Sequence, residues 1–124
     1  MKKYILFVAS FALFASLNLR AEDTTQANTI FKKLLAAQVA KNYDAFVADG
    51  TTELKAALTI TQFQASSDIM ISKLAAGYEI TPLGELNKQG YEIYLYRLRF
   101  KNGDDDMLGT LSLKDGKVGG IYFK

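Results

Sequence analysis

The feature that most constrains this chain is a change of hydrophobic period at residue 78. Before this point, apolar residues recur at spacings of three and four; after it, they largely recur at every second position. A period of two is typical of strands that bury one face against a core. The pattern predicts four consecutive strands, covering Tyr78–Leu86, Tyr91–Phe100, Met107–Leu113 and Val118–Phe123.

Two short turns predict how these strands pair. Asn102-Gly103 and Asp115-Gly116 are strong hairpin signals, because both central residues of a type I′ turn need positive φ. Read as two-residue loops, they predict these pairs: Lys101–Asp104, Arg99–Asp106, Leu98–Met107, Tyr96–Gly109, Tyr94–Leu111, Lys114–Lys117, Leu113–Val118, Leu111–Gly120 and Gly109–Tyr122. The only proline, Pro82, predicts that the first strand lies at an edge of the sheet.

Directly opposed residues share a face of a sheet, so these pairs sort the side chains into two sets. The predicted inner face carries Tyr94, Tyr96, Leu98, Phe100, Met107, Leu111, Leu113, Val118 and Tyr122. The predicted outer face carries Ile93, Leu95, Arg97, Arg99, Asp106, Leu108, Thr110, Ser112, Ile121 and Phe123. Gly109 falls between Tyr96 and Tyr122 on the inner face, which predicts a shelf covered by the rings or a shallow recess.

The segment before residue 78 is predicted to be helical. A first helix is expected from the capping residues Asp23, Thr24 and Thr25 to about Lys41, with one apolar stripe facing the sheet. That stripe consists of Ala27, Ile30, Phe31, Leu34 and Leu35.

Shorter helices should follow within 42–50, capped by Asp44 and ended by Gly50, and within 52–58. A longer helix is expected from residue 59 to Gly77, capped by Thr61. Helices followed by an antiparallel meander define an α+β fold, with N-terminal helices packed on one face of a curved antiparallel sheet of about four strands.

Residues 1–21 have the layout of a secretory signal peptide. Lys2 and Lys3 precede an apolar run from Tyr4 to Leu17, and Ala21 is a suitable last residue before cleavage. An uncleaved anchor is the alternative, but the run is shorter than the roughly 20 residues of a membrane-spanning helix. We therefore predict an exported protein, periplasmic or secreted, with one domain over residues 22–124 and no stable membrane anchor after cleavage.

Composition excludes several classes of function. Three of the 15 basic residues lie in the leader, so the mature domain keeps 12 basic residues against 13 acidic ones, a net charge of −1, and nucleic acid is not an expected partner. Cysteine and histidine are absent, which removes the usual nucleophile triads and the commonest metal ligands. We expect no metal and no cofactor. Three consecutive acids, Asp104 to Asp106, lack the alternating spacing of a calcium loop and predict a solvated turn.

Three stretches resemble a known superfamily. They are Lys41-Asn-Tyr-Asp-Ala-Phe46, Leu58-Thr-Ile-Thr-Gln-Phe63 and Asp115-Gly-Lys-Val-Gly-Gly-Ile-Tyr-Phe123. With the order of elements, they resemble the nuclear transport factor 2-like superfamily, also described as a cystatin-like cone, and in particular its small exported members of unknown function. The resemblance implies a curved sheet wrapped around the first helix, a cavity between them, and frequent dimerisation through the outer sheet face. Enzymes of that superfamily often place an Asp–His pair in the cavity, and this chain has no histidine.

The predicted site is a pocket bounded by Tyr94, Tyr96 and Tyr122, with Glu92 at its rim. Phenol rings offer apolar surface with hydroxyl tips, and plain core packing is the alternative interpretation of all three. No residue is predicted to be catalytic. We predict a non-enzymatic binding or interaction module that holds a small apolar ligand or a partner protein.

Two other functions stay open. One is a hydrolase- or isomerase-type enzyme that uses Glu92 or Asp44 with a tyrosine hydroxyl, which would need a cavity carboxylate within hydrogen-bond reach of Tyr94 or Tyr96. The other is a purely structural role in an envelope assembly. The predicted outer face is more apolar than a solvated sheet face. We therefore expect it to be covered, either by a protein partner or by a second copy of the chain in a homodimer.

Overall fold

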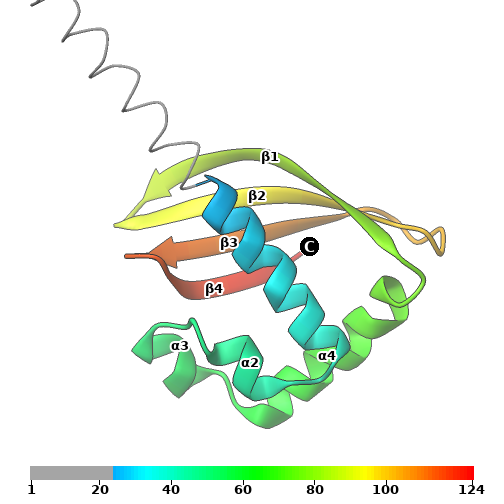
Figure 1. Ribbon diagram of the computed structural model, residues 1–124, viewed down its shortest axis with the longest axis horizontal. Coiled ribbons are helices and arrows are strands. Elements are labelled where there is room, and N and C mark those ends of the chain that lie inside the picture. The colour runs from blue at the N-terminus through cyan, green and yellow to red at the C-terminus, as the bar shows by residue number, and fades with distance from the viewer. Residues whose placement is uncertain (1–23) are drawn as a thin grey trace, which may run out of the picture.

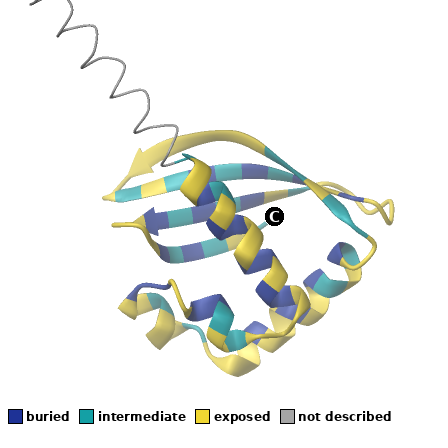
Figure 2. Ribbon diagram, viewed as in Figure 1, coloured by how far each residue is buried: buried dark blue, intermediate teal, exposed yellow. Residues whose placement is uncertain are grey.

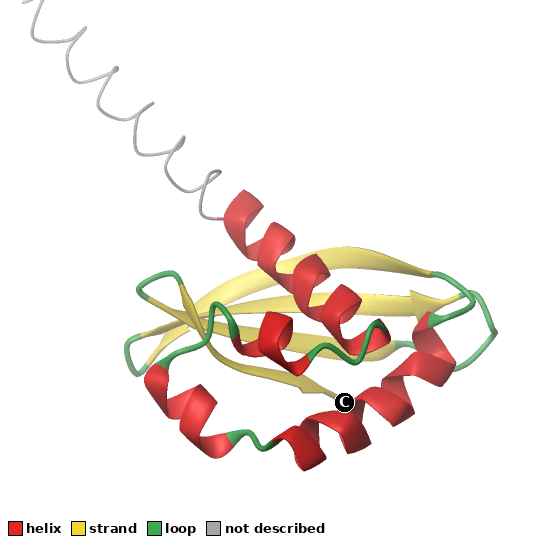
Figure 3. Ribbon diagram, turned by 60° about the horizontal axis from the view of Figure 1, so that its bottom comes forward, coloured by secondary structure: helices red, strands yellow, loops and turns green. Residues whose placement is uncertain are grey.

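The computed structural model describes residues 24–124, which form helices on one side of a four-stranded antiparallel sheet (Figures 1 and 3). The α+β fold with helices packed on a curved sheet is therefore confirmed. The predicted signal peptide and its cleavage point lie outside the described residues. Within residues 24–124, no helix has both the length and the apolar content needed to cross a membrane.

The first helix, residues 24–39, lies across the sheet and carries the predicted apolar stripe on its buried side (Figure 2). All five predicted stripe residues are buried. The helix ends without a glycine: Lys41 takes the left-handed conformation, with φ of 52°. The N–H of Asn42 donates to the carbonyl of Ala37, and the N–H of Lys41 donates to that of Gln38, which is a Schellman motif.

Three further helices cover the rest of the inner side: α2 (Tyr43–Val47), α3 (Thr52–Ala57) and α4 (Ile60–Leu74). The rings of Phe46 in α2 and Phe63 in α4 pack with centroids 4.9 Å apart. Helices α2 and α3 lie near the edge of the sheet formed by β4, opposite β1 (Figure 1).

The caps of α2 and α4 correct two predictions. Asn42 rather than Asp44 caps α2, because its side chain accepts a hydrogen bond from the N–H of Ala45. Thr59 rather than Thr61 caps α4 in a capping box, in which the Gln62 side chain reaches back to the N–H of Thr59. In both cases, the cap is the last residue with extended backbone, and each predicted cap lies inside the helix.

The sheet is a simple meander with strand order β1-β2-β3-β4. Its strands are β1 (Tyr78–Lys88), β2 (Tyr91–Phe100), β3 (Met107–Lys114) and β4 (Lys117–Phe123). As predicted, Pro82 lies in an edge strand, where a register shift between Pro82 and Gly84 bends β1.

The central pairing of β2 with β3 confirms the predicted register. Leu98 pairs with Met107, Tyr96 with Gly109 and Tyr94 with Leu111, so Tyr96 faces the helices and its neighbour Arg97 faces outward.

The connection between these strands is longer than predicted, because residues 101–106 leave the ladder. Lys101 therefore does not pair with Asp104, and Arg99 has no ladder partner in β3 although its Nε lies 3.6 Å from Asp106 Oδ1. Instead, Asp104 pairs with Lys73 of α4, and hydrogen bonds from Lys73 and Asn102 lower the pKa of Asp104. The three aspartates are exposed, in agreement with a solvated turn.

The second half of β4 corrects the predicted face assignment. Leu113 pairs with Val118 as expected, but Ser112 pairs with Gly120, so Gly119 is an extra residue in β4. One extra residue moves every later side chain to the opposite face. Ile121 and Phe123 therefore pack on the core rather than facing outward, and Tyr122 faces outward with 66% of its surface exposed.

Of the two alternatives predicted at Gly109, the structure shows a shelf covered by an aromatic ring rather than a recess, but the covering ring belongs to Phe31 of the first helix. A Cβ atom at Gly109 would lie 2.6 Å from Cζ of Phe31, whose ring stacks on Tyr96 with centroids 4.1 Å apart. Phe123, not Tyr122, stands opposite Gly109 in β4, and its ring centroid lies 6.3 Å from that of Phe31. The first helix therefore contacts the sheet backbone through Phe31, and no ligand space remains beside Tyr96.

Candidate functional site

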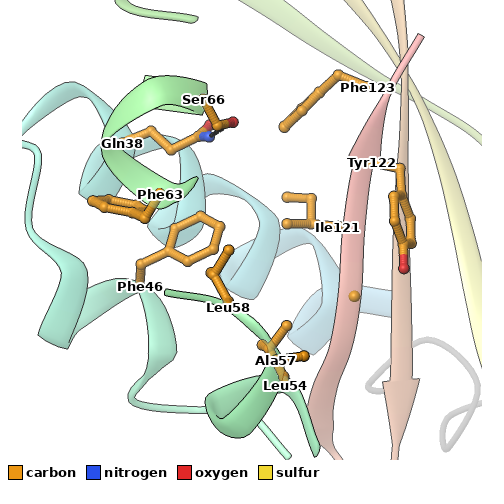
Figure 4. A pocket seen from close by; sticks show the side chains of 11 residues that line it. Gln38, Phe46, Leu54, Ala57, Leu58, Phe63, Ser66, Ile121, Tyr122 and Phe123 are labelled. Carbon is orange, nitrogen blue, oxygen red and sulfur yellow. Dashed lines mark hydrogen bonds between the residues drawn. The ribbon is translucent and has the colours of Figure 1, made fainter. Parts of the chain in front are cut away.

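An apolar cavity of about 220 Å³ opens between β4 and the three shorter helices (Figure 4). One wall is β4, from which Ile121 and Phe123 point toward the helices, and the other is formed by Phe46, Leu58 and Phe63. The full lining consists of Gln38, Phe46, Leu54, Ala57, Leu58, Phe63, Ser66, Gly120, Ile121, Tyr122 and Phe123. This arrangement can bury an apolar group and has no ionisable side chain other than the outward-pointing Tyr122.

Local structure explains how the helical wall is held open. The hydroxyl of Tyr43 donates to the carbonyl of Leu58 at 2.6 Å, which anchors the link between α3 and α4. The Tyr43 ring also meets Phe63 edge-on, with centroids 5.8 Å apart. These two contacts of Tyr43 fix the α3–α4 link and the start of α4 relative to α2, which holds them apart from β4.

Gln38 supplies the main polar group of the cavity. The side chain is only 2% exposed, and its Nε2 donates to Ser66 Oγ at 3.2 Å. Its Oε1 has no hydrogen-bond partner among the described residues. An unpaired buried amide atom costs about 1–3 kcal/mol. The oxygen is itself buried, so Gln38 lines the cavity without presenting this atom at its surface.

Two of the predicted site residues belong to the core instead. Tyr94 and Tyr96 are both buried, and Tyr96 is only 1% exposed. The hydroxyl of Tyr96 donates to Asn28 Oδ1 at 2.8 Å, and burial raises the pKa of Tyr96 to about 12. Neither residue lines the cavity, so plain core packing, the alternative interpretation, describes these two rings.

Glu92 and Tyr94 do lie together. The Tyr94 hydroxyl donates to Glu92 Oε2 at 2.7 Å, as their shared face on β2 predicts. The carboxylate side chain is exposed, and the cavity beside β4 is lined by neither residue. Asp44, the other candidate carboxylate, is exposed in the first turn of α2 and also lies outside the lining.

Tyr122, the third predicted tyrosine, lies beside the cavity because it belongs to β4. Tyr122 is part of the cavity wall, but its side chain points away from the cavity (Figure 4). The structure therefore does not bring the three predicted tyrosines together. The outward ring of Tyr122 lies over Gly120, where an added Cβ would come within 2.8 Å of the ring.

Sequence reasoning did not select the residues that form the actual site, although one signal was present. Gln38 follows Leu34 and Leu35 by four and three residues, so it continues the apolar stripe of the first helix. A glutamine on a buried stripe is the signal that could have found it. Phe46, Leu58 and Phe63 lie within two of the three stretches that resemble the superfamily, but the pattern does not show which of these residues leaves space beside it.

Within residues 24–124, no group of three acidic side chains is arranged to hold a metal ion. Comparison with known proteins finds no matching family model, no matching curated protein and no matching solved structure. The resemblance to the nuclear transport factor 2-like superfamily therefore stays a prediction, and the geometry of the site carries the functional argument.

Proposed function

We propose that this protein is an exported, non-catalytic binding module of the nuclear transport factor 2-like type, which holds an apolar group between β4 and helices α2 to α4. The observation that carries the proposal is the apolar cavity of about 220 Å³ with Gln38 among its lining residues. A cavity with apolar walls and one convergent polar group is typical of a binding site. Export rests on the sequence of residues 1–21 alone.

A fluorescent apolar probe tests this proposal. N-phenyl-1-naphthylamine brightens in an apolar environment, and we expect the purified protein to bind it at the cavity. Ala57→Phe should reduce that binding at least about tenfold, since Ala57 lines the cavity from the end of α3 and the added ring would fill it.

Ala56→Phe is the matched control, because Ala56 is the preceding residue of α3, is exposed, and does not line the cavity. Equal binding of the probe by both variants and the unmodified protein would contradict the proposal.

An enzyme is the second candidate, and one observation favours it: the 2.7 Å hydrogen bond from Tyr94 to Glu92. A general acid or base pair needs such contact. The binding function is better supported, because the carboxylate is exposed and lies outside the cavity, where water rather than substrate surrounds it.

A further inference from the structure

One edge of the sheet is only partly covered. At the start of β4, the segment 49–51 pairs with Val118 as a parallel bridge: the N–H of Thr51 donates to the Val118 carbonyl, and the N–H of Val118 donates to the Asp49 carbonyl, both at 2.8 Å. The chain then turns away into α3. The fold thus begins a fifth strand on β4 and does not continue it past Val118.

The uncovered part of β4 presents backbone hydrogen-bonding groups along the open edge of the sheet. Leu108 and Lys124 exchange two backbone hydrogen bonds, of 2.9 and 3.0 Å. Bonded and non-bonded pairs alternate along an antiparallel ladder, so the pairs made by Phe123 and Ile121 are non-bonded pairs. Their N–H and C=O groups point away from β3, toward the open edge, and the side chains of the same two residues line the cavity (Figure 4).

The size of the cavity indicates what can occupy this edge. A volume of about 220 Å³ is smaller than the roughly 300–1,000 Å³ of pockets that enclose a drug-sized ligand. It suits one or two side chains whose backbone stays outside, beside β4. An extended peptide does this, because its backbone bonds to a strand edge while alternate side chains enter pockets.

We propose that the open stretch of β4 accepts an extended, apolar segment of a partner polypeptide as a fifth strand, continuing the pairing that residues 49–51 begin at Val118. The backbone of the segment bonds to Ile121 and Phe123, and one of its apolar side chains enters the cavity toward Gln38. This inference rests on the proposed function, because it assigns the apolar group of that proposal to a peptide side chain.

A model peptide tests the inference: seven residues in which threonine and valine alternate between terminal lysines, with both ends blocked. We expect the peptide to slow hydrogen exchange at the amides of Ile121 and Phe123, measured by NMR on the intact protein. Two N-methylated peptides serve as controls, one methylated at the odd-numbered amides and the other at the even-numbered amides. Only one of the two should lose the protection of Ile121 and Phe123, because only one set of amides faces β4.

Two substitutions at one position separate backbone pairing from side-chain burial. Ile121→Ala removes the side chain and keeps the N–H, whereas Ile121→Pro also removes the N–H, which β3 does not use. We expect the proline variant to bind the peptide about tenfold more weakly than the alanine variant, the effect of one net hydrogen bond.

Unchanged exchange at Ile121 and Phe123 in the unmodified protein would overturn the inference, as would equal peptide binding by two folded variants. If the peptide fails while N-phenyl-1-naphthylamine still binds in an Ala57-dependent way, strand addition is wrong and the binding cavity stands. If the naphthylamine also fails, the proposed function falls with it.

Discussion

Tyr96 joins the centre of the sheet to the first helix by two different contacts. Its ring stacks on Phe31, and its hydroxyl donates to Asn28, one turn before Phe31 on the same helix. Burial favours the neutral phenol and raises the pKa of Tyr96 from 10.0 to about 12. Because the folded pKa lies above the unfolded one, the neutral phenol stabilises the fold fully below about pH 10, and this contribution is lost as the pH rises through 12.

Tyr96→Phe tests this contact. At pH 8, the variant should lose about 1 kcal/mol of unfolding free energy, because the hydrogen bond to Asn28 is gone. Between pH 10 and 11.5, its stability should fall less steeply than that of the unmodified protein, since the buried phenol no longer ionises. Urea unfolding at several pH values measures both, and equal alkaline slopes would contradict the argument.

Gly109 shows why one position in β3 tolerates no side chain. Gly109→Ala would place a Cβ 2.6 Å from the Phe31 ring, which is held between Tyr96 and Phe123. We expect a loss of about 1–3 kcal/mol by urea unfolding, the usual cost of overpacking. In a Phe31→Leu background, the same change should cost much less; a cost that is the same in both backgrounds would show that the clash with the ring is not the cause.

At the scale of single elements, helix caps depend on where the extended backbone ends. Thr59→Ala should destabilise the protein by about 1 kcal/mol, because α4 loses the acceptor for the N–H of Gln62. Thr61→Ala, the matched control two residues later, should change stability by less than about 0.5 kcal/mol, because Thr61 is exposed inside the helix. Chemical denaturation compares the two, and a larger loss at Thr61 would restore the original prediction.

The bulge in β4 decides which aromatic ring reaches the core. Deleting Gly119 should place Gly120 directly after Val118 in an unbroken ladder, still paired with Ser112, so Tyr122 stays outward and Phe123 stays inward. The variant should keep the same core, because Ile121 and Phe123 keep both their partners in β3 and their inward facing. NMR contacts between aromatic rings report the outcome: contacts from Phe31 to Phe123 should persist in the deletion variant, and their replacement by contacts from Phe31 to Tyr122 would show that Gly119 is not the extra residue.

For the molecule as a whole, the two faces of the sheet differ in what covers them. The helices cover the inner face, and the outer face presents apolar side chains to solvent, with Leu108 at 39% exposure opposite Arg97 and Leu86 beside Ile93. Ile121 and Phe123, which were predicted to add to this surface, pack inward instead. Covering of this face by a second copy therefore remains a proposal based on a smaller apolar surface.

Sedimentation velocity tests this proposal. The unmodified protein should sediment as a dimer, and Leu108→Lys should convert it to a monomer, since a charge would be buried at the contact. Ile69→Lys is the control, because Ile69 is also an exposed apolar residue but lies on α4, away from the outer face of the sheet. A monomeric unmodified protein would contradict dimerisation.

The candidate site was the least predictable part of the molecule. Tyr94 and Tyr96 were correctly assigned to the inner face, but the first helix covers them because Phe31 fills the space over Gly109. The cavity lies instead at β4, where three short helices and one strand edge meet. No local pattern predicts a space of this kind, because its size depends on side chains from the first helix, α2, α3, α4 and β4.

The sequence by itself determined the elements, the inner stripe of the first helix, the hairpin at Asp115-Gly116 and the facing of Tyr96 toward the helices. These follow from periodicity and turn chemistry, which act over a few residues. Only the tertiary structure decided the end of β4. The sequence Gly119-Gly120 is compatible with an unbroken strand or with a bulge. Packing selects the bulge, because it buries Phe123, whose side chain has no polar atom, and leaves the hydroxyl of Tyr122 in water.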